Sequence, residues 1–402
     1  MTNLQSFQSF QFLPFILPKT FRKSTMKTYR VGLIGCGFIG KVHAYGHLNI
    51  PLFFDLPGYK SKITMVCAAH LESARKNADK IGDGIQTTTD FRDITENPDI
   101  DIVDICTPND QHCPAILSAI ANQKHIYCDK PLTATLEEAE QIAAALKNYH
   151  GTAQMTLQNR FLPAPLRAKQ LIDEGAIGDV LEFRTAYLHA GSADPKAPLK
   201  WKLSGKAGGG VIADLGSHIL DLTEYLIGPF ESLLATTHIA YSMRPSADDP
   251  SKMVPVDAED NMNVIVRLPN GASGTVTASK IATGAEDEIR VEIHGSKGAL
   301  RFNGMKPHGL QFYDCSAQGS PIGGRRGWTT IDTGQRFPAP ANFPGPKFAI
   351  GWLRGHMQCL YNFLDAVHNG LPGNPGLMRG VEVQRWLEKV RQSAKDNAWV
   401  KL

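Results

Sequence analysis

The sequence lacks long hydrophobic runs, blocks of like charge and paired cysteine motifs. No stretch approaches the roughly 18 consecutive apolar residues that a membrane-spanning helix needs, so we expect no membrane partner. Lys and Arg number 42 against 39 for Asp and Glu, and both signs are scattered along the chain. Because nucleic-acid binding typically requires a concentrated basic surface, we expect no nucleic-acid partner.

Cysteine is present but follows no metal-binding or disulfide pattern. The seven cysteines are an odd number, and several stand in apolar runs typical of buried strands. This usage favours reduced thiols and a cytoplasmic location. Structural zinc sites usually contain C-x₂₋₄-C pairs, and neither His112-Cys113 nor the pair His125 and Cys128 fits that pattern. We predict no metal site.

The remaining composition is that of an ordinary globular protein. Hydrophobic residues make up 42% of the 402 residues and charged residues 20%, which excludes disordered, collagen-like and disulfide-scaffold classes. Residues 1–28 are expected to form a flexible tail, because prolines interrupt the apolar patch at 12–17 and no targeting signal frames it. Translation starting at Met26 would explain the same segment.

Short apolar runs alternate with helical stretches from residue 29 onward, as in a parallel sheet with crossover helices. The predicted strands are 29–34, 62–68, 101–106 and 124–128, and the predicted helices are 38–49, 71–81, 111–122 and 136–149. The segment 51–62 is an apolar insertion before the second strand, which could line a pocket or cover the sheet.

The pattern changes near Gly151. After a strand at 152–157 and a helix at 163–174, the chain becomes rich in strands with alternating polar and apolar residues. The predicted strands are 180–188, 262–268, 273–281, 290–294 and 299–302, and helices at 353–368 and 380–396 follow. Alternation predicts a mostly antiparallel sheet with one wet or interface-facing side. Since a neighbouring subunit often covers such a face, we expect a homodimer or homotetramer.

A glycine motif, Gly35-Cys36-Gly37-Phe38-Ile39-Gly40, directly follows the first predicted strand and opens a predicted helix. In a dinucleotide site Gly35 permits the tight turn, Gly37 lets backbone approach a pyrophosphate, and Gly40 lets helix and strand pack closely. The alternative is a glycine-rich turn without a ligand. The context favours a dinucleotide-binding Rossmann domain at 29–150, followed by a substrate-binding and oligomerisation domain at 151–402.

The end of the second strand leaves the choice of dinucleotide open. An acidic residue normally binds the adenosine ribose there, but the sequence has Cys67, Ala68, Ala69 and His70. His70 could face the 2′-phosphate of NADP, or be simply exposed. We expect NAD or NADP as cofactor, with NAD favoured.

Two further loops follow predicted strands, and ligands bind at such carboxyl ends in these folds. One is Thr107-Pro108-Asn109, and the other begins with Asp129 and Lys130. A lysine in this position can present its charge to a substrate hydroxyl. Viewed alone, Lys130 is more typical of a surface lysine.

The segment 208–228 predicts a helix with two distinct faces. One face is apolar, and the other carries Asp214, His218, Asp221 and Tyr225. A carboxylate one turn from a histidine can bond one ring nitrogen and leave the other free as a general base. A solvent-exposed polar stripe is the alternative.

These segments together resemble the glucose–fructose oxidoreductase, inositol dehydrogenase and MocA (Gfo/Idh/MocA) family from residue 29 to the C-terminus. The resemblance rests on GLIGCGFIG, TPNDQH, DKP in place of the usual EKP, NRFLPAPLRAKQLIDEGAIGDV and the D-x-x-x-H pair. Within the family, PLFFDLP and YLHAGSADPKAPLKW are most similar to levoglucosan dehydrogenase and related glucoside 3-dehydrogenases. The implied fold class is α/β: a doubly wound parallel sheet followed by an α+β domain with a large open sheet.

The resemblance implies roles for individual residues. Lys130 and His218 would be the catalytic pair, supported by Asp214, and these three would contact the substrate together with Arg160. Trp201 could supply a stacking face for the sugar ring or, equally, pack in the core. The nicotinamide half of the cofactor would be lined by Thr107, Pro108, Asn109, His112 and Asp129. The chain departs from the family pattern at Asn159, where a tyrosine is usual, and at Asp129, where glutamate is usual.

The expected function is NAD(P)-dependent oxidation of a secondary hydroxyl, at C3, of a sugar, glycoside or anhydrosugar. His218 would take the hydroxyl proton while Lys130 stabilises the developing alkoxide. Three alternatives stay open: an inositol (cyclitol) 2-dehydrogenase, a redox-neutral glycosidase that uses NAD transiently, and a non-catalytic NAD(P)-sensing module.

Overall fold

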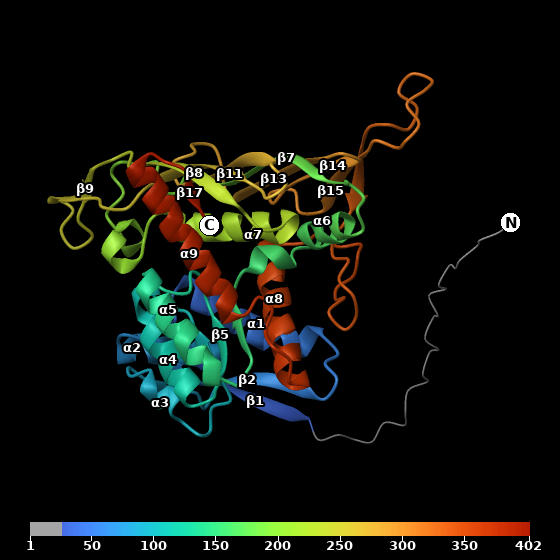
Figure 1. Cartoon of the computed structure of the whole chain (residues 1–402). Coiled ribbons are helices and arrows are strands. Elements are labelled where there is room, and N and C mark those ends of the chain that lie inside the picture. Colours follow the sequence, from blue (N-terminus) through green and yellow to red (C-terminus); the bar gives the residue numbers. More distant parts are fainter. Residues whose placement is uncertain (1–25) are drawn as a thin grey trace, which may run out of the picture.

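The structure of the protein, a computed structural model, describes residues 26–402. Its N-terminal part is a parallel sheet with the strand order β3-β2-β1-β4-β5-β6, seen in the lower half of Figure 1. The strands are β1 (Lys27–Ile34), β2 (Tyr59–Cys67), β3 (Gln86–Thr88), β4 (Ile102–Ile105), β5 (His125–Cys128) and β6 (Ala153–Met155). This order is that of a doubly wound dinucleotide-binding fold, so the predicted Rossmann sheet is confirmed.

Helices cover this parallel sheet. They are α1 (Phe38–Phe53), α2 (Leu71–Ile81), α3 (Arg92–Thr95), α4 (His112–Ala121) and α5 (Leu136–Ala145). The helix α8 (Trp352–Asn369), far along the chain, also packs against α1, where its Phe363 and Leu364 are buried with Tyr29 and Val31. A helix from the C-terminal part therefore completes the core of the N-terminal domain.

The C-terminal domain contains a nine-stranded sheet in the order β16-β15-β14-β13-β7-β12-β11-β8-β17. Its strands are β7 (Val180–Leu188), β8 (Ser232–His238), β11 (Asn261–Arg267), β12 (Ser273–Ser279), β13 (Glu288–Gly295), β14 (Gly298–Asn303), β15 (Gly309–Asp314), β16 (Trp328–Asp332) and β17 (Val400–Lys401). Every pairing is antiparallel except that of β7 with β12. The predicted mostly antiparallel sheet is confirmed. A separate hairpin joins β9 (Met243–Pro245) to β10 (Met253–Pro255).

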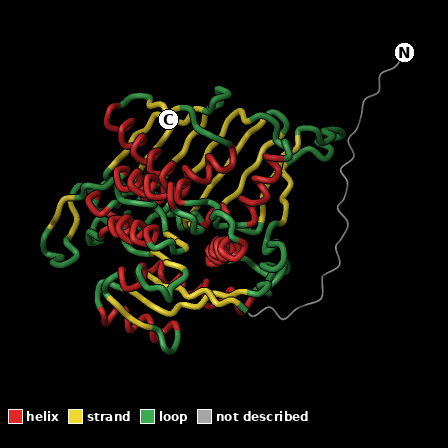
Figure 2. The backbone as a smooth tube through the Cα atoms, turned by 60° about the horizontal axis from the view of Figure 1, so that its bottom comes forward, coloured by secondary structure: helices red, strands yellow, loops and turns green. Residues whose placement is uncertain are grey.

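Three helices lie across one face of the large sheet, which Figure 2 shows with its strands side by side. They are α6 (Pro163–Asp173), α7 (Ser217–Ile227) and α9 (Leu377–Asp396). On α7, Ile219 and Leu222 are buried against strand residues such as Val264 and Val276. Strand residues alternate in burial, so that Ile265, next to Val264, is exposed on the opposite face. This alternation places one apolar layer between sheet and helices.

Some predicted boundaries need correction. The segment 51–62 is not a free insertion, because α1 continues through Pro51 to Phe53 and β2 begins at Tyr59. Between them Phe54 is buried in the core with its ring against Tyr361 of α8. The sheet starts at Lys27, and residues 1–25 of the predicted tail lie outside the described residues. None of the helices in the described part combines the length and apolar content that crossing a bilayer requires.

Candidate active site

The glycine motif shapes a pocket at the carboxyl ends of β1, β4 and β5. Gly35 has φ +97°, and a Cβ there would lie 2.6 Å from the Cys106 backbone, so only glycine fits the turn. A Cβ on Gly40 would lie 2.1 Å from the Gly35 oxygen, whereas one on Gly37 would meet nothing within 4 Å. Gly40 therefore serves helix–strand packing, and Gly37 leaves room for a ligand.

This nucleotide pocket has a volume of about 590 Å³. The predicted cofactor residues that line it are Gly35, Gly37, Phe38, Ile39, Thr107, Pro108, Asn109, Asp129 and Lys130. The Asn109 side chain donates to the Gly208 carbonyl at 2.7 Å, whereas the buried Thr107 hydroxyl has no partner among the described residues. A glycine turn at the start of a helix, an unpartnered hydroxyl and loops at the carboxyl ends of parallel strands fit a dinucleotide.

Three predicted cofactor residues lie outside the lining of this pocket. Gly40 lies beneath it, in the packing role just described. His112 is buried, with its ring nitrogens 3.0 Å from the Pro131 carbonyl and 2.9 Å from the Thr107 carbonyl, so it ties the two loops together from behind. His70 is exposed before α2, and the wall there consists of Ala68, Ala69 and Ser73 instead.

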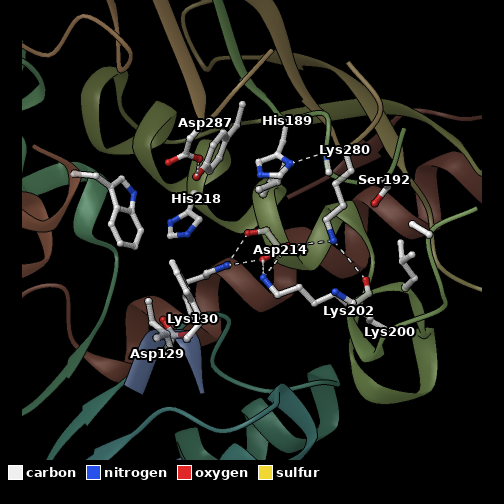
Figure 3. A pocket seen from close by; sticks show the side chains of 18 of the residues that line it. Asp129, Lys130, His189, Ser192, Lys200, Lys202, Asp214, His218, Lys280 and Asp287 are labelled. Carbon is white, nitrogen blue, oxygen red and sulfur yellow. Dashed lines mark hydrogen bonds and ion pairs between the residues drawn. The ribbon is translucent and has the colours of Figure 1, made fainter. Parts of the chain in front are cut away.

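A second pocket of about 550 Å³ adjoins the first, and Asp129, Lys130, Lys202 and Asp214 line both. Figure 3 shows Lys130 and His218 projecting into this second pocket from different domains. Lys130 follows β5 of the parallel sheet, and His218 belongs to α7 under the large sheet. The structure thus brings together two residues that the sequence separates by 88 positions.

Asp214 organises the positive charge of this pocket. Its carboxylate lies 2.9 Å from the Lys130 ammonium, 3.2 Å from that of Lys202 and 3.1 Å from that of Lys280. Lys130 also donates to the Asp214 carbonyl at 2.8 Å. Burial disfavours the ionised carboxylate, but the three ammonium groups hold the pKa of Asp214 well below its usual range. Asp214 therefore stays ionised and fixes the Lys130 ammonium at the junction of the pockets.

His218 is buried and is in its neutral form. Burial, together with the nearby Lys130 charge, holds the pKa of its imidazole well below the usual range. The ring lies 5.8 Å from that of Tyr187, whose hydroxyl donates to Asp287 at 2.6 Å. A neutral imidazole facing a pocket beside a fixed cation can accept a proton from a bound hydroxyl group.

The predicted hydrogen bond between the Asp214 carboxylate and a ring nitrogen of His218 is absent among the described residues. Asp214 lies in η6 (Ile212–Gly216), a π-helical turn, and His218 lies in the α-helix that follows. Because backbone bonds in a π-helix run from i to i+5, residues four apart no longer lie directly above one another. The lysines bind the carboxylate instead, and the His218 Nδ1 has no partner within residues 26–402.

Of the residues predicted to contact the substrate, Lys130, Asp214 and His218 line the second pocket, whereas Arg160 and Trp201 do not. Arg160 does not line the second pocket; its guanidinium donates to Asp221, with Nε at 2.7 Å, and lies 4.5 Å from the Tyr225 ring centroid. Its charge is thus neutralised inside the domain. Trp201 lines the nucleotide pocket and not the second pocket.

Several residues that line the second pocket were not predicted. Lys280 follows β12 and has no nearby motif, whereas His189 lies within the segment 187–201 and Lys202 directly follows it. Tyr187 on β7 and Asp287, which directly precedes the neighbouring strand β13, form a hydrogen-bonded pair. The resemblance of 187–201 to sugar-oxidising enzymes could have indicated His189, but no local signal marks Lys280.

A dinucleotide pocket that opens onto a polar pocket with a lysine and a neutral histidine defines an NAD-binding oxidoreductase. Residues 29–157 match the oxidoreductase family with an NAD-binding Rossmann fold, and residues 166–301 match the GFO/IDH/MocA C-terminal domain. The chain belongs to the Gfo/Idh/MocA family of oxidoreductases.

Individual relatives extend this similarity over almost the whole chain. Levoglucosan dehydrogenase of Pseudarthrobacter phenanthrenivorans is 34% identical, with 93% of this chain and 98% of the relative covered. Inositol 2-dehydrogenase of Rhizobium meliloti is 30% identical, with 71% and 78% covered. The solved structure of levoglucosan dehydrogenase in complex with NADH and levoglucosan has a TM-score of 0.87 at 33% identity, covering 94% of this chain and 99% of that one.

Proposed function

We propose that the protein oxidises the C3 hydroxyl of a sugar, glycoside or anhydrosugar with NAD, and that Lys130 and His218 are the catalytic pair. The observation that carries this proposal is the convergence of a fixed ammonium and a neutral imidazole in one pocket that opens onto the nucleotide pocket. The similarity to levoglucosan dehydrogenase along 93% of the chain supports the sugar substrate.

The cofactor would be held by the glycine turn and by the loops that carry Thr107, Asn109 and Asp129. When bound, NAD⁺ supplies the acceptor for the hydride. His218 accepts the hydroxyl proton, and Lys130 stabilises the developing negative charge on the same oxygen. Asp214 holds Lys130 in place at 2.9 Å, so no reorganisation is needed during the reaction.

The polar lining of the second pocket suits a polyhydroxylated ring. Asp287, hydrogen-bonded to Tyr187, can accept from a sugar hydroxyl, and His189 and Lys200 also line the pocket. Pro198 and Leu203 add apolar surface for the ring carbons. Pockets of this kind, apolar with a few placed polar groups, are typical of small-ligand sites.

The catalytic pair is tested with the variants Lys130→Met and His218→Ala. Loss of a preorganised cation or a general base costs ~10²- to 10⁴-fold in kcat, measured as formation of reduced nicotinamide from levoglucosan and methyl glucosides. Lys206→Met, an exposed lysine outside both pockets, is the matched control and keeps wild-type turnover. Near wild-type turnover of either site variant would overturn the assignment.

The substrate class is tested with the wild-type protein and a panel of glucose, glucosides, levoglucosan and inositols. We expect the highest kcat/KM with a glucoside or anhydrosugar. A clear preference for inositols would contradict the substrate class but leave the catalytic pair in place. Release of free sugar from a glycoside without accumulation of reduced cofactor would indicate the redox-neutral alternative.

A further inference from the structure

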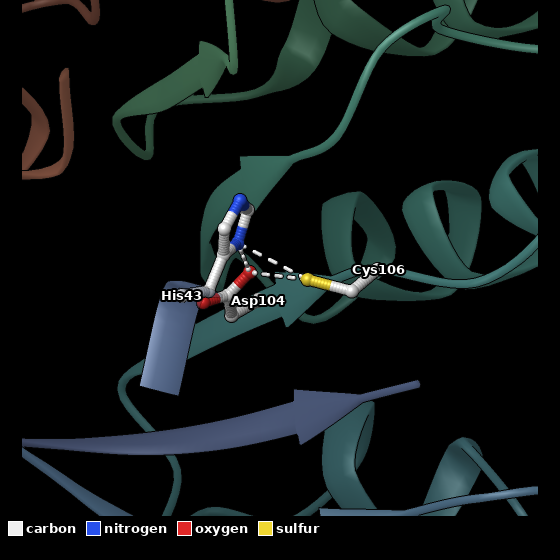
Figure 4. Close-up of side chains that lie close together, drawn as sticks. All are labelled: His43, Asp104 and Cys106. Carbon is white, nitrogen blue, oxygen red and sulfur yellow. Dashed lines mark hydrogen bonds and ion pairs between the residues drawn. The ribbon is translucent and has the colours of Figure 1, made fainter. Parts of the chain in front are cut away.

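A fully buried polar cluster lies in the N-terminal domain, behind the second pocket. His43 on α1 contacts Asp104 on β4 at 2.7 Å, and Cys106 contacts the same His43 nitrogen at 3.1 Å (Figure 4). The other Asp104 oxygen lies 3.2 Å from His47, which in turn lies 2.9 Å from Ser61. None of the reaction steps described above uses this cluster.

The cluster has the geometry of a hydrogen-bonded network. Although His43, Asp104 and Cys106 offer three grouped metal-ligand types, separations of 2.7 and 3.1 Å are hydrogen-bond distances. The buried carboxylate of Asp104 accepts from His43 Nδ1, which fixes the tautomer and leaves Nε2 with a free lone pair. His43 Nε2 is buried and has no partner among the described residues.

His356 on α8 lies between this cluster and the second pocket. Its ring centroid is 6.4 Å from that of His43, and His356 lines the pocket together with His218. His356 is buried, and neither of its ring nitrogens has a partner in the described part of the chain; the same holds for His218 Nδ1. Buried polar atoms almost always bond to protein or to internal water, so water bridging these nitrogens would form a continuous path.

We propose that His356 and His43 relay the proton that His218 takes from the substrate, with Asp104 as the counter-charge. This inference rests on the proposed role of His218. The proton leaves His218 through Nδ1, passes to one nitrogen of His356, and the opposite nitrogen releases a proton through water to His43 Nε2. His218 and His356 each gain one proton and lose one, so both end in the neutral form. His43 holds the proton as an imidazolium paired with Asp104, and it returns the proton along the same path to the water that refills the pocket after the product leaves.

The charges around the three rings give the relay a direction. Burial holds the pKa of His356 well below its usual range, and a charge on His43 would lower it further. For His43, burial disfavours the charged ring, but Asp104 outweighs it and raises the pKa above the usual value of about 6.5. A proton released by His218 is therefore more stable on His43.

The remaining neighbours of the relay are few. His43 also faces Tyr127, at 4.9 Å between ring centroids, and the more distant Asp129. His356 faces Trp352, at 4.3 Å, and the Lys130 charge. Facing His218 are Lys130, Asp214, Lys202 and Tyr187. Among these neighbours, Asp104 is the carboxylate that lies within hydrogen-bond distance of an imidazole of the relay, that of His43. Because this carboxylate stabilises the charged ring, the path ends at His43.

The relay acts after hydride transfer, so its loss slows turnover but not substrate capture. We expect His356→Phe and His43→Gln each to lower kcat by at least about tenfold while kcat/KM stays within about twofold. His368→Gln, on α8 but outside the second pocket, is the matched control. NADH binding and thermal unfolding are measured on every variant. Folded variants with wild-type kcat, or with kcat and kcat/KM reduced equally, would overturn the relay.

The wild-type protein provides a second measurement that needs no variant. Turnover through a chain of exchanging protons gives a curved dependence of kcat on the deuterium fraction of the solvent, whereas a linear dependence would contradict the relay. Asp104→Asn moves the pH limb of kcat to lower pH, because His43 loses the charge that raises its pKa. Full turnover by His218→Ala would overturn the proposed function itself. Failure of the proposed function is thereby distinguished from failure of the relay alone.

Discussion

Asp214 shows how one side chain can set the chemistry of a site. Its carboxylate neutralises part of the charge of Lys130, Lys202 and Lys280, and Lys280 is itself buried. A buried ammonium without a carboxylate would lose its proton. Burial, together with the net positive charge that remains, keeps the nearby His218 neutral and so ready to act as a base.

The neutral state of His218 predicts the pH dependence of substrate capture. Protonation removes the base, and the pKa of His218 lies well below the usual histidine value. We therefore expect kcat/KM to stay constant as the pH falls through about 6.5, and to decline only at lower pH. Steady-state kinetics in overlapping buffers measures this, and a decline centred at or above that pH would contradict the charge arrangement.

The contacts of Arg160 predict a role in the stability of the fold and not in substrate binding. It donates to the buried Asp221, which Arg379 also contacts at 2.7 Å. Arg160→Gln should lower the free energy of unfolding by about 3 kcal/mol, measured by urea denaturation, without a large change in KM. The partly exposed Arg167→Gln is the control, with a change of roughly 0.5 kcal/mol or less. A raised KM at unchanged stability would instead support substrate contact.

In the turn from β1 into α1, one glycine is needed for ligand binding and another for packing of the fold. Gly37→Ala adds a methyl group to open space, so the fold tolerates it, but the methyl group would obstruct a pyrophosphate. We expect at least about tenfold weaker NADH binding with unchanged thermal stability. Gly40→Ala meets the Gly35 oxygen and should cost about 2 kcal/mol of stability. NADH binding is measured by fluorescence titration and stability by thermal unfolding, for both variants. An equal loss of NADH affinity in the two variants would contradict the separate roles of Gly37 and Gly40.

The sequence predicted those elements whose pattern is strong and local. The bounds of α2 and β7 match the predicted 71–81 and 180–188, because a periodic pattern ends at clear breakers in both. The strand β3 was missed because its three residues are too few to show alternation. β16 was missed within a stretch rich in Gly, Pro and Arg, since its pairing with β15 depends on a distant partner.

The sequence predicted those residues of the candidate site that lie within recognisable motifs. Lys130 and His218 stand in segments that resemble the family. The partners of Asp214 were not predictable, because the π-helical turn redirects its carboxylate and Lys280 arrives from a remote strand. His356 carries no motif, and its position depends on how α8 packs against the N-terminal domain.

The face of the large sheet that α6, α7 and α9 leave uncovered suits a subunit interface. Residues such as Arg184, Thr275 and Arg290 line a shallow depression of about 860 Å³ there, and Ile265 is exposed beside them. We propose that a second copy of the chain covers this face, as symmetric homo-oligomers commonly do.

This proposal predicts that Ile265→Arg lowers the molar mass in solution, because it replaces an exposed apolar side chain of the proposed interface by a charged one. Leu371→Arg, at an exposed leucine away from the sheet, is the control and leaves the mass unchanged. Light scattering coupled to size exclusion measures both. A wild-type monomer, or an unchanged oligomer for Ile265→Arg, would contradict the proposed interface.

Hydride transfer from C3 is tested most directly with levoglucosan that carries deuterium at that carbon only. Incubated with the protein and NAD⁺, this substrate should give nicotinamide that carries the deuterium, with a primary isotope effect on kcat/KM, and a 3-keto product. Unlabelled reduced nicotinamide, together with a product that keeps its deuterium, would show that another carbon is oxidised and would contradict hydride transfer from C3.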